Sequence, residues 1–157
     1  DFKKDFENII SLNIIKFFQL RLKKANDETL INLINFINPI CNKHNIKFII
    51  NDRPDLAKLF DLDGVHIGKD DASLIKCRSI LGKKKIIGKS CYSSIYNACN
   101  AQNFGASYVA FGSMFNTKTK DKTNRVFLPN INAWNKIKKI PSVGIGGINI
   151  RNILRAK

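Results

Sequence analysis

Charged residues follow several short apolar runs in this sequence of 157 residues. Arg21 and Lys23 come after one such run, and Asp52 comes directly after another. Asp71 follows a third run and Lys120 a fourth. Cations of this kind can grip a phosphorylated anion, and magnesium prefers carboxylate oxygens together with phosphate oxygens. Together, these residue types could bind Mg²⁺ and a phosphorylated anion at one site.

Six short apolar runs alternate with segments of helical periodicity. Strands are expected to begin near residues 14, 46, 64, 85, 107 and 141. Helices are expected at 5–12, 27–44, 54–60, 71–81, 94–104 and 128–138, with a last one beginning at 149. Arg21 and Lys23 are two residues apart and are therefore expected to point to the same side of one strand. In an α/β barrel the carboxyl ends of the strands form the active site, so the charged residues should meet there.

The expected fold class is α/β, a TIM-type (β/α)8 barrel of which this sequence carries roughly six of the eight strand–helix units. The sequence opens in a predicted helix and stops within another, so we expect the first and last strands to be missing. An open doubly wound sheet is the alternative. No linker or low-complexity tract divides the sequence, which predicts a single, partial domain over 1–157.

Composition excludes several classes of protein. Hydrophobic residues make up 44% of the sequence, without the run of about 18 that a membrane helix needs, so we expect a globular, cytoplasmic protein. The four cysteines form no C-x-x-C pair, so we expect reduced thiols rather than disulfides or a zinc site.

The formal net charge of +15 comes from 27 basic residues that are dispersed along the sequence. Dispersed lysines are typical of a solvated surface, which argues against nucleic acid as a partner. The same charge would draw an anionic small molecule toward a cleft. A homo-oligomer is compatible with these features.

The motifs at the ends of the predicted strands form an ordered series. They are Gln19-x-Arg21-x-Lys23, Asn51-Asp52-Arg53, Gly64-Val65-His66-Ile67-Gly68 followed by Asp71, Gly88-x-Ser90, Gly112 with Thr117-x-Thr119-Lys120, and Ile145-Gly146-Gly147-Ile148-Asn149. In order and spacing this series resembles the thiamine-phosphate synthase family, across nearly the whole chain. The resemblance implies a TIM barrel that joins hydroxymethylpyrimidine diphosphate to thiazole phosphate, releasing pyrophosphate and using Mg²⁺. It also implies a dissociative substitution, which requires no protein nucleophile.

The resemblance assigns a role to each site residue. Gln19 and Asn51 would hydrogen-bond the aminopyrimidine, and Ser90 would contact the pyrimidine diphosphate substrate. Mg²⁺ would be held by Asp52 and Asp71, and the leaving diphosphate would be neutralised by Arg21, Lys23 and Lys120. The thiazole phosphate would be held by Thr117, Thr119 and the backbone N–H of Gly147 at a helix start.

Several of these residues also have an ordinary structural explanation. Asp52 could be a helix N-cap, and so could Asp70 or Asp71. Thr117 and Thr119 could be loop polar residues, and Gly146-Gly147 a tight turn. His66, inside an apolar strand, is expected to be a hydrogen-bonded core histidine rather than an acid or base.

Four positions depart from the family pattern. Leu22 stands where glutamate is common, Lys69 replaces glutamine, Lys89 a small apolar residue and Asn116 a proline. The two added lysines are expected near the anion site. Two other functions remain open: a thiazole tautomerase-like relative on the same fold, and a non-catalytic ligand-binding barrel.

Overall fold

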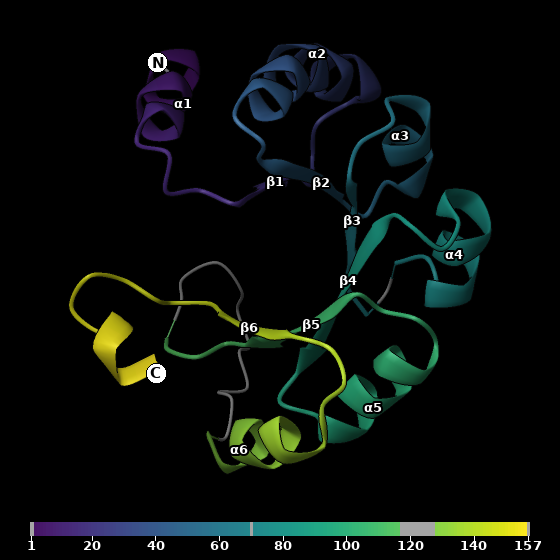
Figure 1. The fold of residues 1–157 in the computed structure, drawn as a ribbon, viewed down its shortest axis with the longest axis vertical. Coiled ribbons are helices and arrows are strands. Elements are labelled where there is room, and N and C mark those ends of the chain that lie inside the picture. The colour runs from purple at the N-terminus through teal and green to yellow at the C-terminus, as the bar shows by residue number, and fades with distance from the viewer. Residues whose placement is uncertain (1, 70, 117–127, 157) are drawn as a thin grey trace. The chain divides into compact units, whose positions relative to one another are not determined.

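The computed structural model describes residues 2–69, 71–116 and 128–156, in which strands and helices alternate (Figure 1). The helices are α1 (Phe2–Ser11), α2 (Asp27–Lys43), α3 (Pro54–Leu59), α4 (Leu74–Leu81), α5 (Ile95–Asn103) and α6 (Leu128–Ile137). The strands are β1 (Phe17–Leu20), β2 (Lys47–Asn51), β3 (Gly64–Ile67), β4 (Ile86–Tyr92), β5 (Tyr108–Gly112) and β6 (Ser142–Ile145). A short 3-10 helix, Ile153–Ala156, follows β6.

The strands hydrogen-bond in chain order, β1-β2-β3-β4-β5-β6. The pairs β1–β2, β4–β5 and β5–β6 are parallel. An order that never reverses is that of a barrel and argues against a doubly wound sheet, in which the order reverses at the ligand site. The six predicted strand–helix units are therefore confirmed in the described residues, while the eight-unit barrel remains a prediction.

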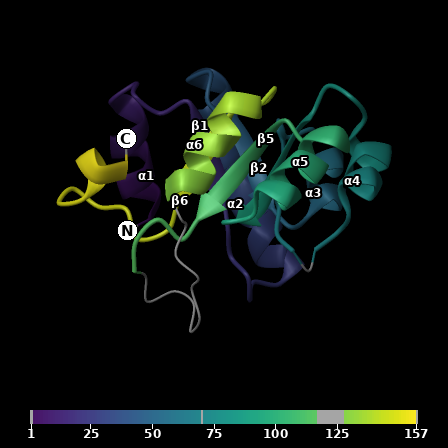
Figure 2. The ribbon, with the colours of Figure 1, turned by 90° about the horizontal axis from the view of Figure 1, so that it is seen from below.

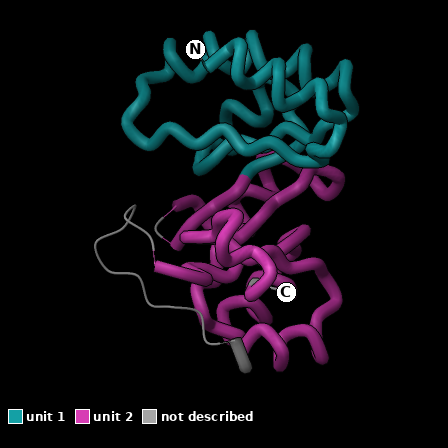
Figure 3. Tube along the Cα trace, turned by 90° about the vertical axis from the view of Figure 1, so that its left-hand side faces the viewer, with its two compact units in different colours: residues 1–65 teal, residues 66–157 magenta. Residues whose placement is uncertain are grey.

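The chain divides into two compact units, residues 1–65 and 66–157 (Figure 3). The prediction of a single domain over 1–157 remains a prediction.

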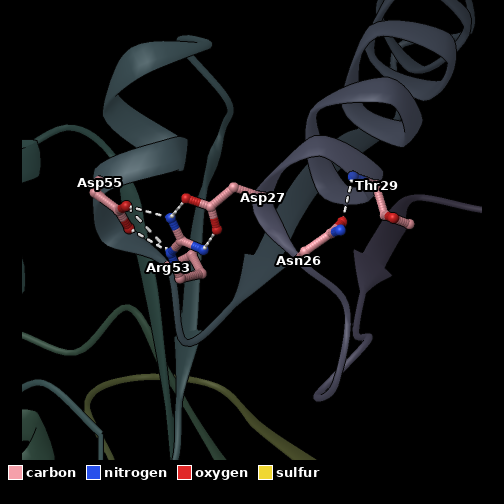
Figure 4. Close-up of polar contacts among 5 residues, drawn as sticks. All are labelled: Asn26, Asp27, Thr29, Arg53 and Asp55. Atoms are coloured by element: carbon pink, nitrogen blue, oxygen red, sulfur yellow. Dashed lines mark hydrogen bonds and ion pairs between the residues drawn. The ribbon is translucent and has the colours of Figure 1, made fainter.

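In the first unit, α2 covers β2 with a stripe of buried residues at helical spacing. Its buried residues are Leu30, Ile34, Ile37 and Cys41, and three consecutive residues of β2, from Phe48 to Ile50, are buried. The helix begins at Asp27 because the side chain of Asn26 accepts a hydrogen bond from the Thr29 N–H at 2.9 Å (Figure 4).

In the second unit, α5 packs against β4 and β5 and contacts α6 (Figure 2). The largest fully buried side chain, Trp134 of α6, lies edge-on to Phe111 of β5 with ring centroids 6.0 Å apart. Strand β4 is irregular, because its register with β5 shifts between Ser90 and Tyr92. Such bulges reorient side chains and are common beside active sites.

Four elements begin three or more residues from their predicted start, and the first of them is α1, which begins at Phe2 rather than at residue 5. β1 begins at Phe17 rather than near 14, because its ladder begins where Phe17 pairs with Lys47, and Ile14 is largely exposed. α4 begins at Leu74, after the N-cap Ser73, rather than at Asp71.

The fourth difference concerns the helix predicted to begin at 149. Residues 150–152 form a turn, and the 3-10 helix begins only at Ile153. The Asn149 side chain accepts from the Arg151 N–H at 2.9 Å, a local bond that competes with helix formation. In the described part of the chain, no helix has the length and apolar character needed to cross a bilayer.

Candidate active site

Two amides lie together at the ends of β1 and β2 in the first unit. Gln19 Nε2 donates to Asn51 Oδ1 at 2.8 Å. This bond leaves the Gln19 carbonyl oxygen as an acceptor and the Asn51 amide as a donor. The pair can therefore offer one acceptor and one donor to a planar heteroaromatic ligand, while its binding of the pyrimidine remains a prediction.

Asp52 follows β2 directly and has a left-handed backbone, with φ of 61°. Aspartate tolerates this conformation better than most residues, and such backbone is frequent at functional sites. Asp52 is not the cap of α3, because the N-cap position is taken by Arg53, whose side chain makes no capping bond. The N-cap explanation for Asp52 is therefore wrong.

A cavity of about 260 Å³ lies beside Asp52. Its lining residues are Leu20, Leu22, Lys23, Ala25, Leu30, Ile50, Asn51, Asp52 and Arg53. It therefore brings a predicted cation, Lys23, to the same cavity as the predicted metal ligand Asp52 and the predicted pyrimidine ligand Asn51.

The expected arrangement of Arg21 and Lys23 on one strand is wrong. β1 ends at Leu20, so both cations lie in the irregular segment beyond it, and Lys23 is in a turn. The alternation of side chains along a strand therefore does not govern their directions. Both are exposed, and Arg21 is not among the residues that line the 260 Å³ cavity.

Arg53, which sequence reasoning passed over, connects the starts of two helices (Figure 4). Its guanidinium contacts Asp27 at the start of α2 at 2.5 Å and Asp55 at the start of α3 at 2.6 Å. Hydrogen bonding to Arg53 lowers the pKa of both carboxyl groups below the ordinary value of 3.8. Arg53 thus fixes the segment that carries Asp52; the acidic first turns of both helices were the available sequence signal.

In the second unit, Asp71 is held by the end of β3. Its Oδ2 accepts from the Gly68 N–H at 2.5 Å. A Cβ at position 68 would lie 2.7 Å from that oxygen, so a side chain there would displace the Asp71 carboxylate. Asp71 is not the cap of α4, because Ser73 takes that role by accepting from the Lys76 N–H.

Two lysines that depart from the family pattern, Lys69 and Lys89, line the same cavity as Asp71. The Lys89 ammonium donates to the Gly68 carbonyl. The backbone of Gly68 therefore contacts both the Lys89 ammonium and the Asp71 carboxylate. A cavity of about 410 Å³ is lined by Lys69, Asp71, Lys89 and Ser90, among others. The added lysines thus lie with Asp71 and Ser90, as expected.

His66 is a core histidine, as predicted. It is 6% exposed, and its ring is hydrogen-bonded on both sides. Nδ1 lies 2.8 Å from the Tyr108 hydroxyl and Nε2 lies 2.9 Å from the Ser90 hydroxyl. Ser90, which is predicted to contact the pyrimidine diphosphate substrate, is therefore coupled to two residues that had no assigned role; the sequence spacing gave no signal for this link.

Gly147 is not at the start of a helix, which corrects that prediction. It has φ of 71°, and a Cβ there would lie 2.5 Å from the Asn116 carbonyl oxygen. It is thus a turn position packed against the segment before residue 117. The predicted ligands Thr117, Thr119 and Lys120 lie outside the described residues.

Asp52 and Asp71 are the predicted ligands of Mg²⁺. Among residues 2–69, 71–116 and 128–156, no group of three or more His, Cys, Asp or Glu side chains could hold a metal ion. Mg²⁺ needs no such cage, because it usually takes one or two carboxylates and completes its shell with phosphate oxygens and water. Asp52 of the first unit and Asp71 of the second are each hard oxygen donors of the kind that Mg²⁺ prefers, and their joint binding of one ion remains a prediction.

The four cysteines are free, as predicted, and three of them are buried. Burial raises the pKa of the Cys41 thiol to about 11 and that of Cys91 to about 12. These thiols are therefore part of the core rather than reactive groups.

Six strands in chain order, followed by helices and with polar groups at the strand ends, define an α/β fold that is consistent with a TIM-like barrel. The family model described as thiamine monophosphate synthase matches residues 1–157, and the chain belongs to this family.

Similar proteins agree with this assignment. A thiamine-phosphate synthase of Pelagibacter ubique is 46% identical over 152 residues, which cover 97% of this chain and 73% of the relative. One from Rhodospirillum centenum is 38% identical over 132 residues, covering 84% of this chain and 64% of the relative. The solved structure of thiamine phosphate pyrophosphorylase from Pyrococcus furiosus superposes with a TM-score of 0.78 at 31% identity, covering 87% of this chain and 65% of that one. The chain thus spans between about two thirds and three quarters of these relatives.

Proposed function

We propose that this chain acts as a thiamine-phosphate synthase. It would couple 4-amino-2-methyl-5-hydroxymethylpyrimidine diphosphate to thiazole phosphate and release pyrophosphate. The observation that carries the proposal is the 46% identity to a thiamine-phosphate synthase over 97% of the chain. The reaction needs two phosphorylated small molecules, and we place it in the cytoplasm.

The amide pair of the first unit supports recognition of the pyrimidine. An aminopyrimidine presents a ring nitrogen that accepts and an amino group that donates. The Asn51 amide and the Gln19 carbonyl offer the complementary donor and acceptor, and their mutual bond of 2.8 Å holds them side by side. A ligand lacking the amino group would leave the Gln19 carbonyl without its partner.

Cations would neutralise the diphosphate as it leaves. Lys23 lines the cavity beside Asp52, and Lys89 and Lys69 line the cavity beside Ser90. Arg21 and Lys120 are the other proposed cations. Asp52 and Asp71 would hold Mg²⁺, which supplies positive charge to the diphosphate oxygens. The thiazole phosphate would be bound by Thr117, Thr119 and the backbone N–H of Gly147.

The substitution is dissociative in this proposal. The pyrimidine amino group stabilises the positive charge that remains when the diphosphate departs, and the thiazole nitrogen then attacks that carbon. The protein contributes orientation and charge rather than a covalent bond. This agrees with a site made of cations, carboxylates and amides.

A thiazole tautomerase-like enzyme is the second candidate, and a non-catalytic binder is the third. A tautomerase needs neither a diphosphate clamp nor two metal carboxylates. Retention of Arg21, Lys23, Asp52 and Asp71 in this chain therefore favours the synthase.

The test is an assay of pyrophosphate release with both substrates, with and without Mg²⁺. We expect release that depends on Mg²⁺ and on both substrates. Asp52→Asn and Arg21→Ala should each lower turnover at least tenfold, which is about 1.4 kcal/mol of barrier. Lys24→Ala is the matched control, because Lys24 is an exposed cation of the same segment and has no proposed role. Equal rates in the wild type and both site variants would remove the proposed clamp and metal site.

A further inference from the structure

A chain of three hydrogen-bonded side chains crosses neighbouring strands of the second unit. The His66 ring lies between two hydroxyl groups, with Nδ1 2.8 Å from Tyr108 and Nε2 2.9 Å from Ser90. A neutral imidazole carries one N–H, so one ring nitrogen donates and the other accepts. The two hydrogen bonds must therefore run in the same direction along the chain. Either Tyr108 donates to His66 and His66 donates to Ser90, or Ser90 donates to His66 and His66 donates to Tyr108.

The burial of Tyr108 decides the direction. Burial raises the pKa of the Tyr108 hydroxyl, so this group keeps its hydrogen. In the part of the chain that the structure describes, Nδ1 of His66 is the acceptor within reach of that hydrogen. If Nδ1 instead carried the proton, the Tyr108 hydrogen would be buried without an acceptor, which is unfavourable.

We propose that Tyr108 and His66 are positioning residues that aim the hydroxyl hydrogen of Ser90 at the substrate. Tyr108 donates to Nδ1, and the Nε2–H of His66 donates to Ser90 Oγ. The Ser90 hydrogen cannot then be given to His66 and is left to donate to a phosphate oxygen. This inference rests on the proposed function, in which Ser90 contacts the pyrimidine diphosphate.

This arrangement determines which ligand atoms Ser90 can bind. With its oxygen engaged by Nε2–H, Ser90 presents a donor, and phosphate oxygens are strong acceptors. Ser90 lines the 410 Å³ cavity together with the cations Lys69 and Lys89. A hydroxyl hydrogen has three staggered positions, so holding it in one of them favours binding by up to about threefold.

The first test is the tautomer of His66, read from ¹⁵N NMR of the histidine rings in the wild-type protein. The sequence contains only two histidines, and His44→Gln assigns the other ring. We expect Nε2–H with an unprotonated Nδ1. The Nδ1–H tautomer, or a doubly protonated ring at neutral pH, would overturn the proposal without requiring any variant to fold.

The second test is calorimetric titration of pyrophosphate in the presence of Mg²⁺. We expect Ser90→Ala to weaken binding about tenfold and Tyr108→Phe about threefold, with mixed His66 tautomers in the latter. Tyr96→Phe is the matched control, because this tyrosine is 74% exposed on α5, and it should bind as the wild type does.

The outcomes distinguish a failure of the positioning role from a failure of the proposed function. If Ser90→Ala weakens binding but Tyr108→Phe matches Tyr96→Phe, the positioning role is wrong and the diphosphate site stands. If the wild type does not bind pyrophosphate, the proposed function fails, and the role of Ser90 fails with it even when the tautomer is the expected one.

Discussion

The backbone N–H of Gly68 donates to the carboxylate of Asp71 at 2.5 Å, and a Cβ at position 68 would collide with that same carboxylate. Because a Cβ there would lie 2.7 Å from Asp71 Oδ2, the loop geometry after β3 sets where this carboxylate lies. A proposed metal ligand is thus placed by a neighbouring backbone group rather than by its own helix.

Gly68→Ala should therefore displace Asp71 while leaving the fold intact. We expect Mg²⁺-dependent pyrophosphate binding to fall about tenfold, as for Asp71→Asn, because one ligand contact is lost. Titration calorimetry measures the affinity, and circular dichroism checks the fold. Glu28→Gln, which removes an exposed carboxylate of α2, is the control. Wild-type affinity in both Gly68→Ala and Asp71→Asn would contradict the assignment of Asp71.

Arg53→Ala should lower the melting temperature at neutral pH by a few degrees at most, because partly exposed ion pairs contribute little each. The melting temperature of Arg53→Lys should lie between those of the wild type and Arg53→Ala, since an ammonium cannot form the forked contacts. Lys58→Ala in α3 is a charge-matched control without a proposed role.

The stabilisation by the ion pairs of Arg53 should depend on pH, because the pKa values of Asp27 and Asp55 are lowered. Their folded pKa values lie below the unfolded value of 3.8, so the stabilisation is present above about pH 3.8 and is lost as the pH falls through the folded values. Acid unfolding curves of the wild type and Arg53→Ala should therefore converge toward low pH. A difference that grows as the pH falls would exclude this explanation.

The thiols should differ in reactivity. Cys41, Cys77 and Cys91 are buried, whereas Cys99 is only partly buried. Burial raises the pKa of the three buried thiols, so they are neither accessible nor ionised at pH 8. We expect one thiol to react quickly with an aromatic disulfide reagent in the native protein and all four after unfolding. In Cys99→Ser the fast phase should disappear; its persistence would mean that another thiol is accessible.

Trp134 should tolerate phenylalanine much better than alanine. It is fully buried against Phe111, and its indole N–H has no hydrogen-bond partner among the described residues. Phenylalanine keeps the ring contact and removes the unpaired donor, so we expect a loss of about 1–2 kcal/mol, against about 3–5 kcal/mol for alanine. Urea unfolding followed by circular dichroism measures both. Equal losses would show that the aromatic contact contributes little.

The sequence predicted the local elements well because their signals are local. Six strands and their helices lie close to the expected positions, and Ser73 and Ser94 cap helices as side-chain acceptors. The start of β1 was predicted too early, because a strand begins where its partner pairs with it, and that partner lies 30 positions away at Lys47.

Residue chemistry was also readable from sequence: which positions carry cations, carboxylates and amides, and that they follow apolar runs. The tertiary structure alone decided which groups meet. It joined Gln19 to Asn51, placed Arg53 between Asp27 and Asp55, and set the His66 ring between Ser90 and Tyr108. Hydrogen bonds depend on distances of a few tenths of an ångström, and these contacts between separate elements are fixed by strand pairing and core packing rather than by any local pattern.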